Sequence, residues 1–158
     1  MAAATGGVWK TTDGGVTLQQ AWPDDASQSM GAVAVGPDGA IWAGTGELNP
    51  GGGSITFGGT GGYRSDDGAR TWKSKGLQES GTTGRIVVHP TDPRIVYVAA
   101  GGSLFNPGGE RGIYRSTNGW GIVGAGARTA NAVHRRRRSR DRPPQPVPTV
   151  CGDVGSPP

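Results

Sequence analysis

Short apolar runs separated by glycine-rich polar turns fill the first 119 residues, and this pattern predicts an all-β chain. The runs at 32–35 and 86–88 each precede a turn that contains proline and aspartate, as expected for the buried inner strand of a sheet. No window combines the apolar spacing and the capping residues of a helix. The remaining strands are expected at 41–43, 95–99, 63–64, 113–115 and 71–73.

The apolar runs belong to two interleaved repeats that share one period. Three related segments, at 6–18, 61–72 and 111–119, carry matching hydroxyl residues that lie 54 and 51 positions apart. A second pair of related segments, at 31–47 and 84–102, begins with glycines that lie 53 positions apart. Each period has room for about four short strands, which is typical of the blades of a β-propeller.

We therefore expect a partial β-propeller of about two four-stranded blades, followed by a disordered C-terminal tail. The propeller domain is residues 1–119, divided into a half blade at 6–21, a blade at 31–77 and a partial blade at 84–119. Residues 120–158 form the tail, which is rich in arginine and proline. Propellers close with about 4–8 blades, so a shorter array leaves strand edges through which copies can self-associate.

Each third strand leads into the pattern Ser/Thr-x-Asp-x-Gly-x-Thr-Trp, which we call the clamp. Its carboxylate can accept hydrogen bonds from backbone N–H groups across the turn and from the Ser or Thr hydroxyl, and glycine adopts conformations that a Cβ disfavours. The tryptophan is expected to pack against the neighbouring sheet. The clamp residues are Thr11, Asp13, Gly15 and Thr17 in the first copy, Ser65, Asp67, Thr71 and Trp72 in the second, and Ser116 and Asn118 in the third.

The clamp resembles the Asp box of bacterial neuraminidase repeats. The phrases GTGE (44–47), IVVHPTDPRIVYVAA (86–100) and NPGGERGIYRSTNG (106–119) are similar to those of secreted bacterial propellers of the sortilin and xyloglucanase-like types, and the resemblance covers 6–119. It implies that this chain is a truncated member of that family. It also implies a structural role for the aspartates, because the boxes of sialidases lie away from the catalytic face. A catalytic or calcium-binding role is the alternative.

The loops that join second to third strands are expected on the propeller face opposite the clamps, and they are long, at 47–62 and 101–112. Long loops in a regular repeat are common places for ligand contacts. The candidate contacts to a glycan or protein are Glu47, Asn49, Glu110 and Arg111. The alternative is that the two glutamates brace neighbouring blades by hydrogen bonds.

No catalytic residue is identified. Glycoside hydrolysis normally needs two carboxyl groups that face each other across the sugar. Glu47 and Glu110 occupy matching places in adjacent repeats, which indicates a repeated structural position. The arginine triad and tyrosine nucleophile of a sialidase are not recognisable. We therefore expect a non-catalytic binding or scaffold module, and the alternative is a piece of a glycoside hydrolase without its catalytic blades.

Charge and cysteine content reduce the classes of partner and cofactor that we expect for this chain. The net charge of +4 arises at 128–142, which holds seven arginines, while the rest of the chain is nearly neutral and favours neither a nucleic-acid nor a membrane partner. Cys151 is the only cysteine, so no internal disulfide is expected, and neither a metal site nor a cofactor is predicted. The first ten residues lack the apolar run of a signal peptide, although intact relatives are expected to be secreted.

The repeat stops inside the third clamp, after Gly119. Three interpretations of the tail remain: a shift of the reading frame, a natural disordered extension, and a basic nucleic-acid-binding arm built on the four arginines at 135–138. Read one base on from codon 119, the chain can continue as Ser-Thr-Asn-Gly-Gly-Glu-Ser-Trp, which completes the clamp. Segment 139–147 can then resemble HPTDPRIVY at 89–97.

We expect that the encoding DNA, read one base on from codon 119, continues the repeats without early stop codons. Sequencing of the gene beyond that codon checks this expectation. Stop codons crowded into that frame would contradict it.

Overall fold

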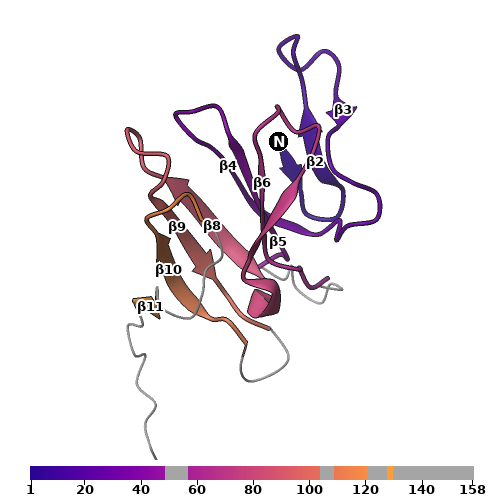
Figure 1. The fold of residues 1–158 in the computed structure, drawn as a ribbon. Coiled ribbons are helices and arrows are strands. Elements are labelled where there is room, and N and C mark those ends of the chain that lie inside the picture. Colours follow the sequence, from indigo (N-terminus) through magenta and orange to yellow (C-terminus); the bar gives the residue numbers. More distant parts are fainter. Residues whose placement is uncertain (49–56, 104–108, 121–127, 130–158) are drawn as a thin grey trace, which may run out of the picture.

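The computed structural model describes residues 1–48, 57–103, 109–120 and 128–129, which form three antiparallel sheets (Figure 1). The first sheet, in the order β1-β2-β3, consists of Ala2–Ala3, Gly7–Lys10 and Gln19–Gln20. The second, in the order β4-β5-β6-β7, consists of Met30–Val35, Ile41–Thr45, Gly62–Ser65 and Lys73–Gly76. The third, in the order β8-β9-β10-β11, consists of Thr83–Val88, Val96–Ala100, Gly112–Ser116 and Arg128–Thr129.

The all-β expectation is confirmed for the described residues. The only helical element among them is η1 (Gln78–Ser80), a short 3-10 turn that leads from the second sheet into the third. Most of the expected tail lies outside the described residues. Within the part of the chain that the structure covers, no helix combines the length and apolar character needed to cross a membrane.

The second and third sheets repeat one pairing pattern. Trp42 of β5 lies opposite Arg64 of β6, and Tyr97 of β9 lies opposite Arg115 of β10 in the same register. The β4–β5 and β8–β9 pairs each carry one irregularity at the same place, near the start of the inner strand. The sequence repeat therefore corresponds to a repeated sheet.

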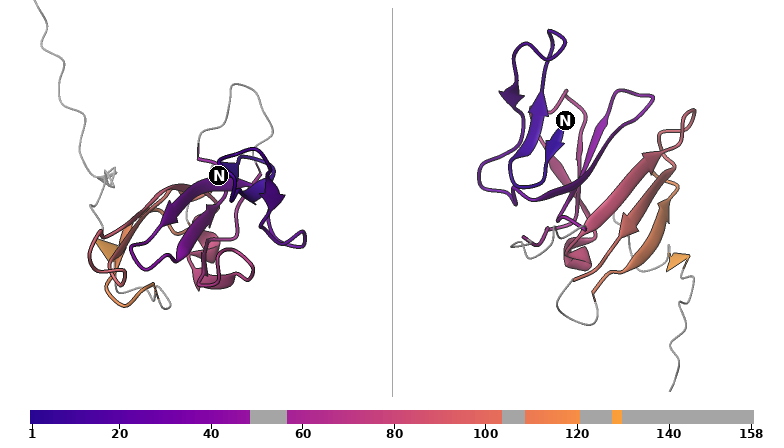
Figure 2. Two further views of the ribbon diagram at one scale, coloured as in Figure 1. Left: turned by 90° about the horizontal axis from the view of Figure 1, so that it is seen from above. Right: turned by 180° about the vertical axis from the view of Figure 1, so that it is seen from behind.

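The three sheets stack face to face (Figure 2), and apolar side chains fill the two interfaces. Because successive residues of a strand point to opposite faces, Trp42 and its neighbour Ala43 belong to different interfaces. Ala43 packs with Val8 and Trp22 on the side of the first sheet. Trp42 packs with residues of the third sheet, and the described strands do not close into a ring.

A pair of parallel indole rings forms the centre of the interface between the second and third sheets. Trp42 and Trp120 are fully buried, with ring centroids 5.3 Å apart and an interplanar angle of 16°. The guanidinium of Arg64 lies over the Trp42 ring, 5.0 Å from its centroid. Gly62 leaves room for the Trp120 ring, since a Cβ at Gly62 would overlap it.

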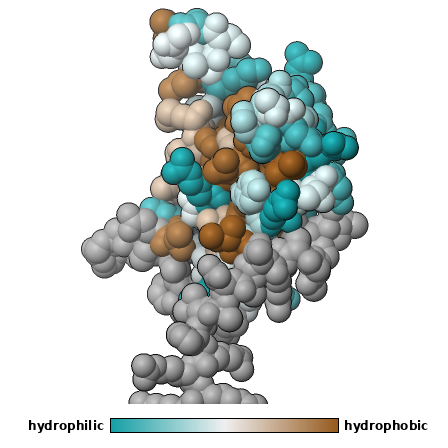
Figure 3. All heavy atoms as spheres, turned by 90° about the vertical axis from the view of Figure 1, so that its left-hand side faces the viewer, coloured by the Kyte–Doolittle hydropathy of each residue, from teal (hydrophilic) through white to brown (hydrophobic). Residues whose placement is uncertain are grey.

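The two apolar runs expected to form buried inner strands carry three exposed valines. Val33 and Val35 of β4 are 39% and 67% exposed, and Val87 of β8 is 46% exposed. Val33 lies opposite Ala43 on the face turned toward the first sheet, but neither Val33 nor Val35 belongs to the apolar cluster between these two sheets. Val87 lies on the outer face of the third sheet, which no other described sheet covers, and apolar atoms reach the surface on this side (Figure 3).

The fourth strand of the second sheet was expected to begin at Thr71, but β7 begins two residues later, at Lys73. Thr71 and Trp72 belong to the preceding turn instead. The backbone N–H of Thr71 is bonded to a carboxylate within that turn and does not join the sheet.

We expect Gly62→Ala to destabilise the chain by about 1–3 kcal/mol, because the added methyl group would collide with the buried Trp120 ring. Gly58→Ala is the matched control, since its Cβ would meet only the Gly81 carbonyl oxygen, 4.0 Å away. The midpoint of urea unfolding of the full chain measures both effects. Equal midpoints for the two variants would contradict the described packing.

Candidate functional site

The second clamp is a closed network of hydrogen bonds around one carboxylate. Asp67 accepts the Ser65 hydroxyl at 2.8 Å and the backbone N–H groups of Arg70 and Thr71 at 3.0 and 2.9 Å. The Thr71 hydroxyl donates to the second carboxylate oxygen at 2.6 Å. The Ser65 hydroxyl oxygen in turn accepts the backbone N–H of Ala69 at 2.8 Å. The end of β6 is thereby tied to the residues that lead into β7.

The first clamp has a corresponding network, without a counterpart of the Arg70 N–H bond. Asp13 accepts the Thr11 hydroxyl at 2.8 Å, the Thr17 N–H at 2.9 Å and the Thr17 hydroxyl at 2.6 Å. The Thr11 oxygen accepts the N–H of Gly15 at 2.8 Å. Two segments 54 positions apart thus use the same side-chain types for the same bonds.

These hydrogen bonds lower the pKa of both clamp carboxyls. The Thr17 hydroxyl, the Thr17 N–H and the Thr11 hydroxyl lower the pKa of Asp13 to about 2. The corresponding bonds from Thr71 and Ser65 lower the pKa of Asp67 further. Both groups are therefore ionised at neutral pH and have no proton to donate as a general acid. In the described part of the chain, no three His, Cys, Asp or Glu side chains gather as a metal site.

The third clamp keeps the backbone conformation with different residues. Ser116 donates to the Asn118 side chain at 2.8 Å and accepts the N–H of Trp120 at 2.7 Å. Trp120 has a φ of 54°, and its counterparts Gly15 and Ala69 have φ values of 98° and 70°. A bulky side chain is sterically disfavoured in this left-handed conformation, which glycine adopts readily.

Of the loop residues predicted as ligand contacts, Glu47 follows β5, and Glu110 and Arg111 directly precede β10, on the chain segments between the strands of each sheet (Figure 1). The Glu110 carboxylate accepts the backbone N–H of Glu79 in η1 at 3.1 Å, so it braces the loop against η1. The Arg111 guanidinium donates to the carbonyl of Ser103 at 2.7 Å.

Glu47 is placed by its backbone, whose N–H donates to the Ser29 hydroxyl at 3.2 Å. Asn49 lies outside the described residues. Among the described residues, no hydrogen bond or ion pair joins Glu47 to Glu110 or Arg111, so the structure does not bring these candidates together.

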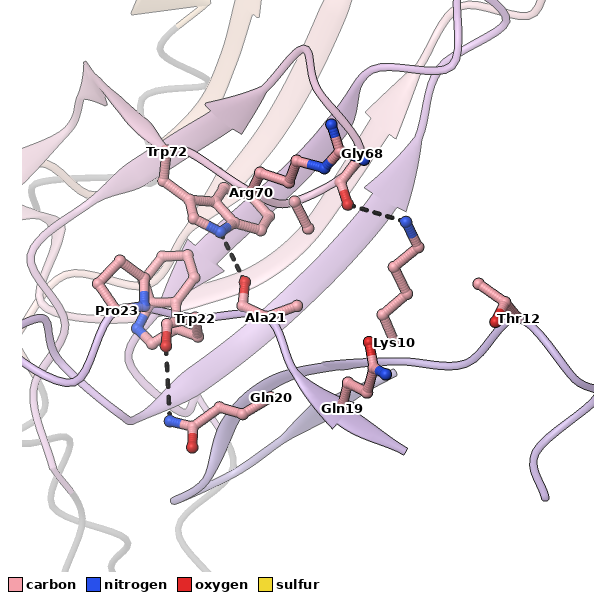
Figure 4. A pocket seen from close by; sticks show the side chains of 11 residues that line it. Lys10, Thr12, Gln19, Gln20, Ala21, Trp22, Pro23, Gly68, Arg70 and Trp72 are labelled. Atoms are coloured by element: carbon pink, nitrogen blue, oxygen red, sulfur yellow. Dashed lines mark hydrogen bonds between the residues drawn. The ribbon is translucent and has the colours of Figure 1, made fainter. Parts of the chain in front are cut away.

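A cavity of about 650 Å³ lies at the other end of the sheets, between the first sheet and the second clamp (Figure 4). Sequence reasoning missed it, because its walls come from separate repeats that only the stacking of the sheets brings together. The one feature of the sequence that pointed to this cavity is the clamp tryptophan, which was expected to pack against the neighbouring sheet. The lining residues are Lys10, Thr12, Gln19, Gln20, Ala21, Trp22, Pro23, Gly68, Ala69, Arg70 and Trp72.

Contacts between the two sheets hold the walls of this cavity in place. The Trp72 indole N–H donates to the carbonyl of Ala21 at 2.7 Å, and the Trp72 and Trp22 rings meet edge to face at 4.9 Å. Lys10 of β2 donates to the carbonyl of Gly68 in the second clamp at 3.1 Å. Among the polar lining residues, Lys10 is thus held against the second clamp.

Comparisons with protein-family models, with curated proteins and with solved structures found no match to this chain. The chain has two candidate sites, the predicted loop residues and the cavity beside the second clamp. Of the two, the cavity beside the second clamp is the one whose lining is described throughout.

We expect Ser65→Ala to destabilise the chain by about 1–3 kcal/mol, because the buried N–H of Ala69 would lose its acceptor. Thr11→Ala removes the same bonds from the first clamp, but water can reach the N–H of Gly15 there, so we expect a much smaller loss. Thermal unfolding followed by circular dichroism measures the difference. A loss at Thr11 that equals the loss at Ser65 would show that burial of the clamp does not matter.

Proposed function

We propose that this chain is a non-catalytic binding and scaffold module, built from Asp-box repeats as a partial β-propeller of about two four-stranded blades. The observation that carries the proposal is the use of the clamp carboxylates. Asp13 and Asp67 accept hydrogen bonds on both oxygens from groups of their own turns. The most prominent repeated chemical feature of the chain therefore serves its structure.

The stacking of the sheets supports the propeller part of the proposal. In a propeller, each four-stranded sheet packs its face on the next and places its inner strand beside the inner strand of its neighbour. Here β4 and β8, the first strands of the second and third sheets, contact each other, and the two sheets have the same register. The exposed valines of β4 and β8 are where further sheets of such a ring would pack.

The placement of the carboxylates supports the non-catalytic part. A glycoside hydrolase needs a pair of carboxyl groups that flank the scissile bond. The lining of the cavity contains no carboxylate. Glu110, on the loop face, is bonded to the backbone of η1.

We expect the full chain to hydrolyse neither aryl sialosides, aryl glucosides nor xyloglucan oligosaccharides faster than the uncatalysed reaction, because no described carboxyl pair flanks a binding cavity. Release of the aryl group and chromatography of the oligosaccharides measure turnover. Turnover that survives purification and disappears in Glu110→Gln would overturn the proposal and favour a glycoside hydrolase. Asp67→Asn serves as the control for changes that act through folding alone.

A further inference from the structure

The cavity beside the second clamp has an uncompensated positive charge. Its two charged lining residues are Lys10 and Arg70, and none of its lining residues is acidic. The side chains of both reach the Gly68 turn (Figure 4). Among the described residues, neither cation forms an ion pair, and the Lys10 ammonium donates its one described bond to a neutral carbonyl.

The cation at the position of Lys10 has acidic partners in the next repeat. Arg64 corresponds to Lys10, since each directly precedes the hydroxyl residue of its clamp. Arg64 is paired with Asp66 at 2.7 Å and with Asp38 at 3.1 Å. Thr12 stands where Asp66 stands in the later repeat, and it lines the cavity. The fold therefore tolerates a carboxylate at this position, and the first repeat lacks one where the cavity opens.

Neutral polar groups surround the two cations. Gln19 and Gln20 of β3 and the hydroxyl of Thr12 line the cavity. The side-chain N–H₂ of Gln20 donates to Asp24 at 2.8 Å, which leaves its amide oxygen as an acceptor for a ligand hydroxyl. Cavities of 300–1,000 Å³ accommodate small ligands, and this one, at about 650 Å³, lies within that range.

We infer that this cavity binds an acidic saccharide, in which a carboxylate or sulfate group faces Lys10 and Arg70 and hydroxyl groups face Gln19, Gln20 and Thr12. The planar guanidinium of Arg70 binds two oxygens of an oxyanion, and the ammonium of Lys10 adds a second, less directional charge. The inference rests on the proposed function, because it names the ligand class of a non-catalytic binding module.

Isothermal titration of the full chain with tetragalacturonate, with a sulfated disaccharide and with neutral maltotetraose tests the inference. The two acidic probes separate a carboxylate from a sulfate as the preferred oxyanion. We expect at least one of them to bind about tenfold more tightly than maltotetraose, which is the effect of one charge-assisted contact. We expect Lys10→Gln and Arg70→Gln each to weaken that binding about tenfold.

Thr12→Asp provides a test that keeps both cations. The new carboxylate would pair with Lys10, as Asp66 pairs with Arg64, and we expect it to weaken binding as much as Lys10→Gln does. Lys75→Gln and Arg85→Gln remove equal charges outside the cavity and should leave affinity unchanged. Circular dichroism of each variant confirms that it is folded.

Three results would overturn the inference: no binding of either acidic probe by the folded chain, equal binding of maltotetraose, or equal losses in the two control variants. None of these results would be evidence of catalysis. The hydrolysis assays therefore test the non-catalytic function independently of this inference. Binding of both acidic probes with the expected losses would assign the site to oxyanions in general.

Discussion

One carboxylate closes the turn in each of the first two clamps, and the contact between the first and second sheets depends on the second of these turns. Asp67 joins Ser65, at the end of β6, to Thr71, just before β7. The closed turn determines where Trp72 emerges, and its indole reaches across to the backbone of Ala21 and to the ring of Trp22. A local network of hydrogen bonds thus places the aromatic side chain that joins two sheets and forms one wall of the cavity.

The backbone conformation of the clamp turn also bears on the third clamp. Its turn requires a left-handed residue at position 120, where the chain has a tryptophan. Tryptophan has the single codon TGG, and codon 121 for glycine begins with G. Read one base on, position 120 therefore becomes GGG, a glycine codon. The alternative reading frame specifies at this position the residue that the backbone favours. In the present chain, the Trp120 ring fills the interface against Trp42 instead.

Most strands and the clamps were predictable because each depends on residues close together in the sequence, and the period was visible because the same segments recur. The exposure of Val33 and Val35 could not be predicted, because a strand that another sheet covers and a strand that is left uncovered can have the same apolar pattern. The start of β7 was also predicted incorrectly. The strand propensity of Thr71 does not reveal that its backbone N–H bonds to Asp67 and not to a neighbouring strand. The cavity depends on how Lys10 and Arg70, 60 positions apart, are brought together by stacking, which no local pattern encodes.

The central claim is that the clamp carboxylates belong to the turns and hold them closed. Titration of the Asp13 and Asp67 carboxyl carbons by NMR in the full chain tests it directly. Their lowered pKa values mean that the clamps stabilise the fold above the ordinary aspartate pKa of 3.8 and lose this effect as the pH falls towards 2. We predict a pKa of about 2 for Asp13 and a lower one for Asp67. Titration of both groups near 3.8 would show that the carboxylates are free in solution and would contradict the account.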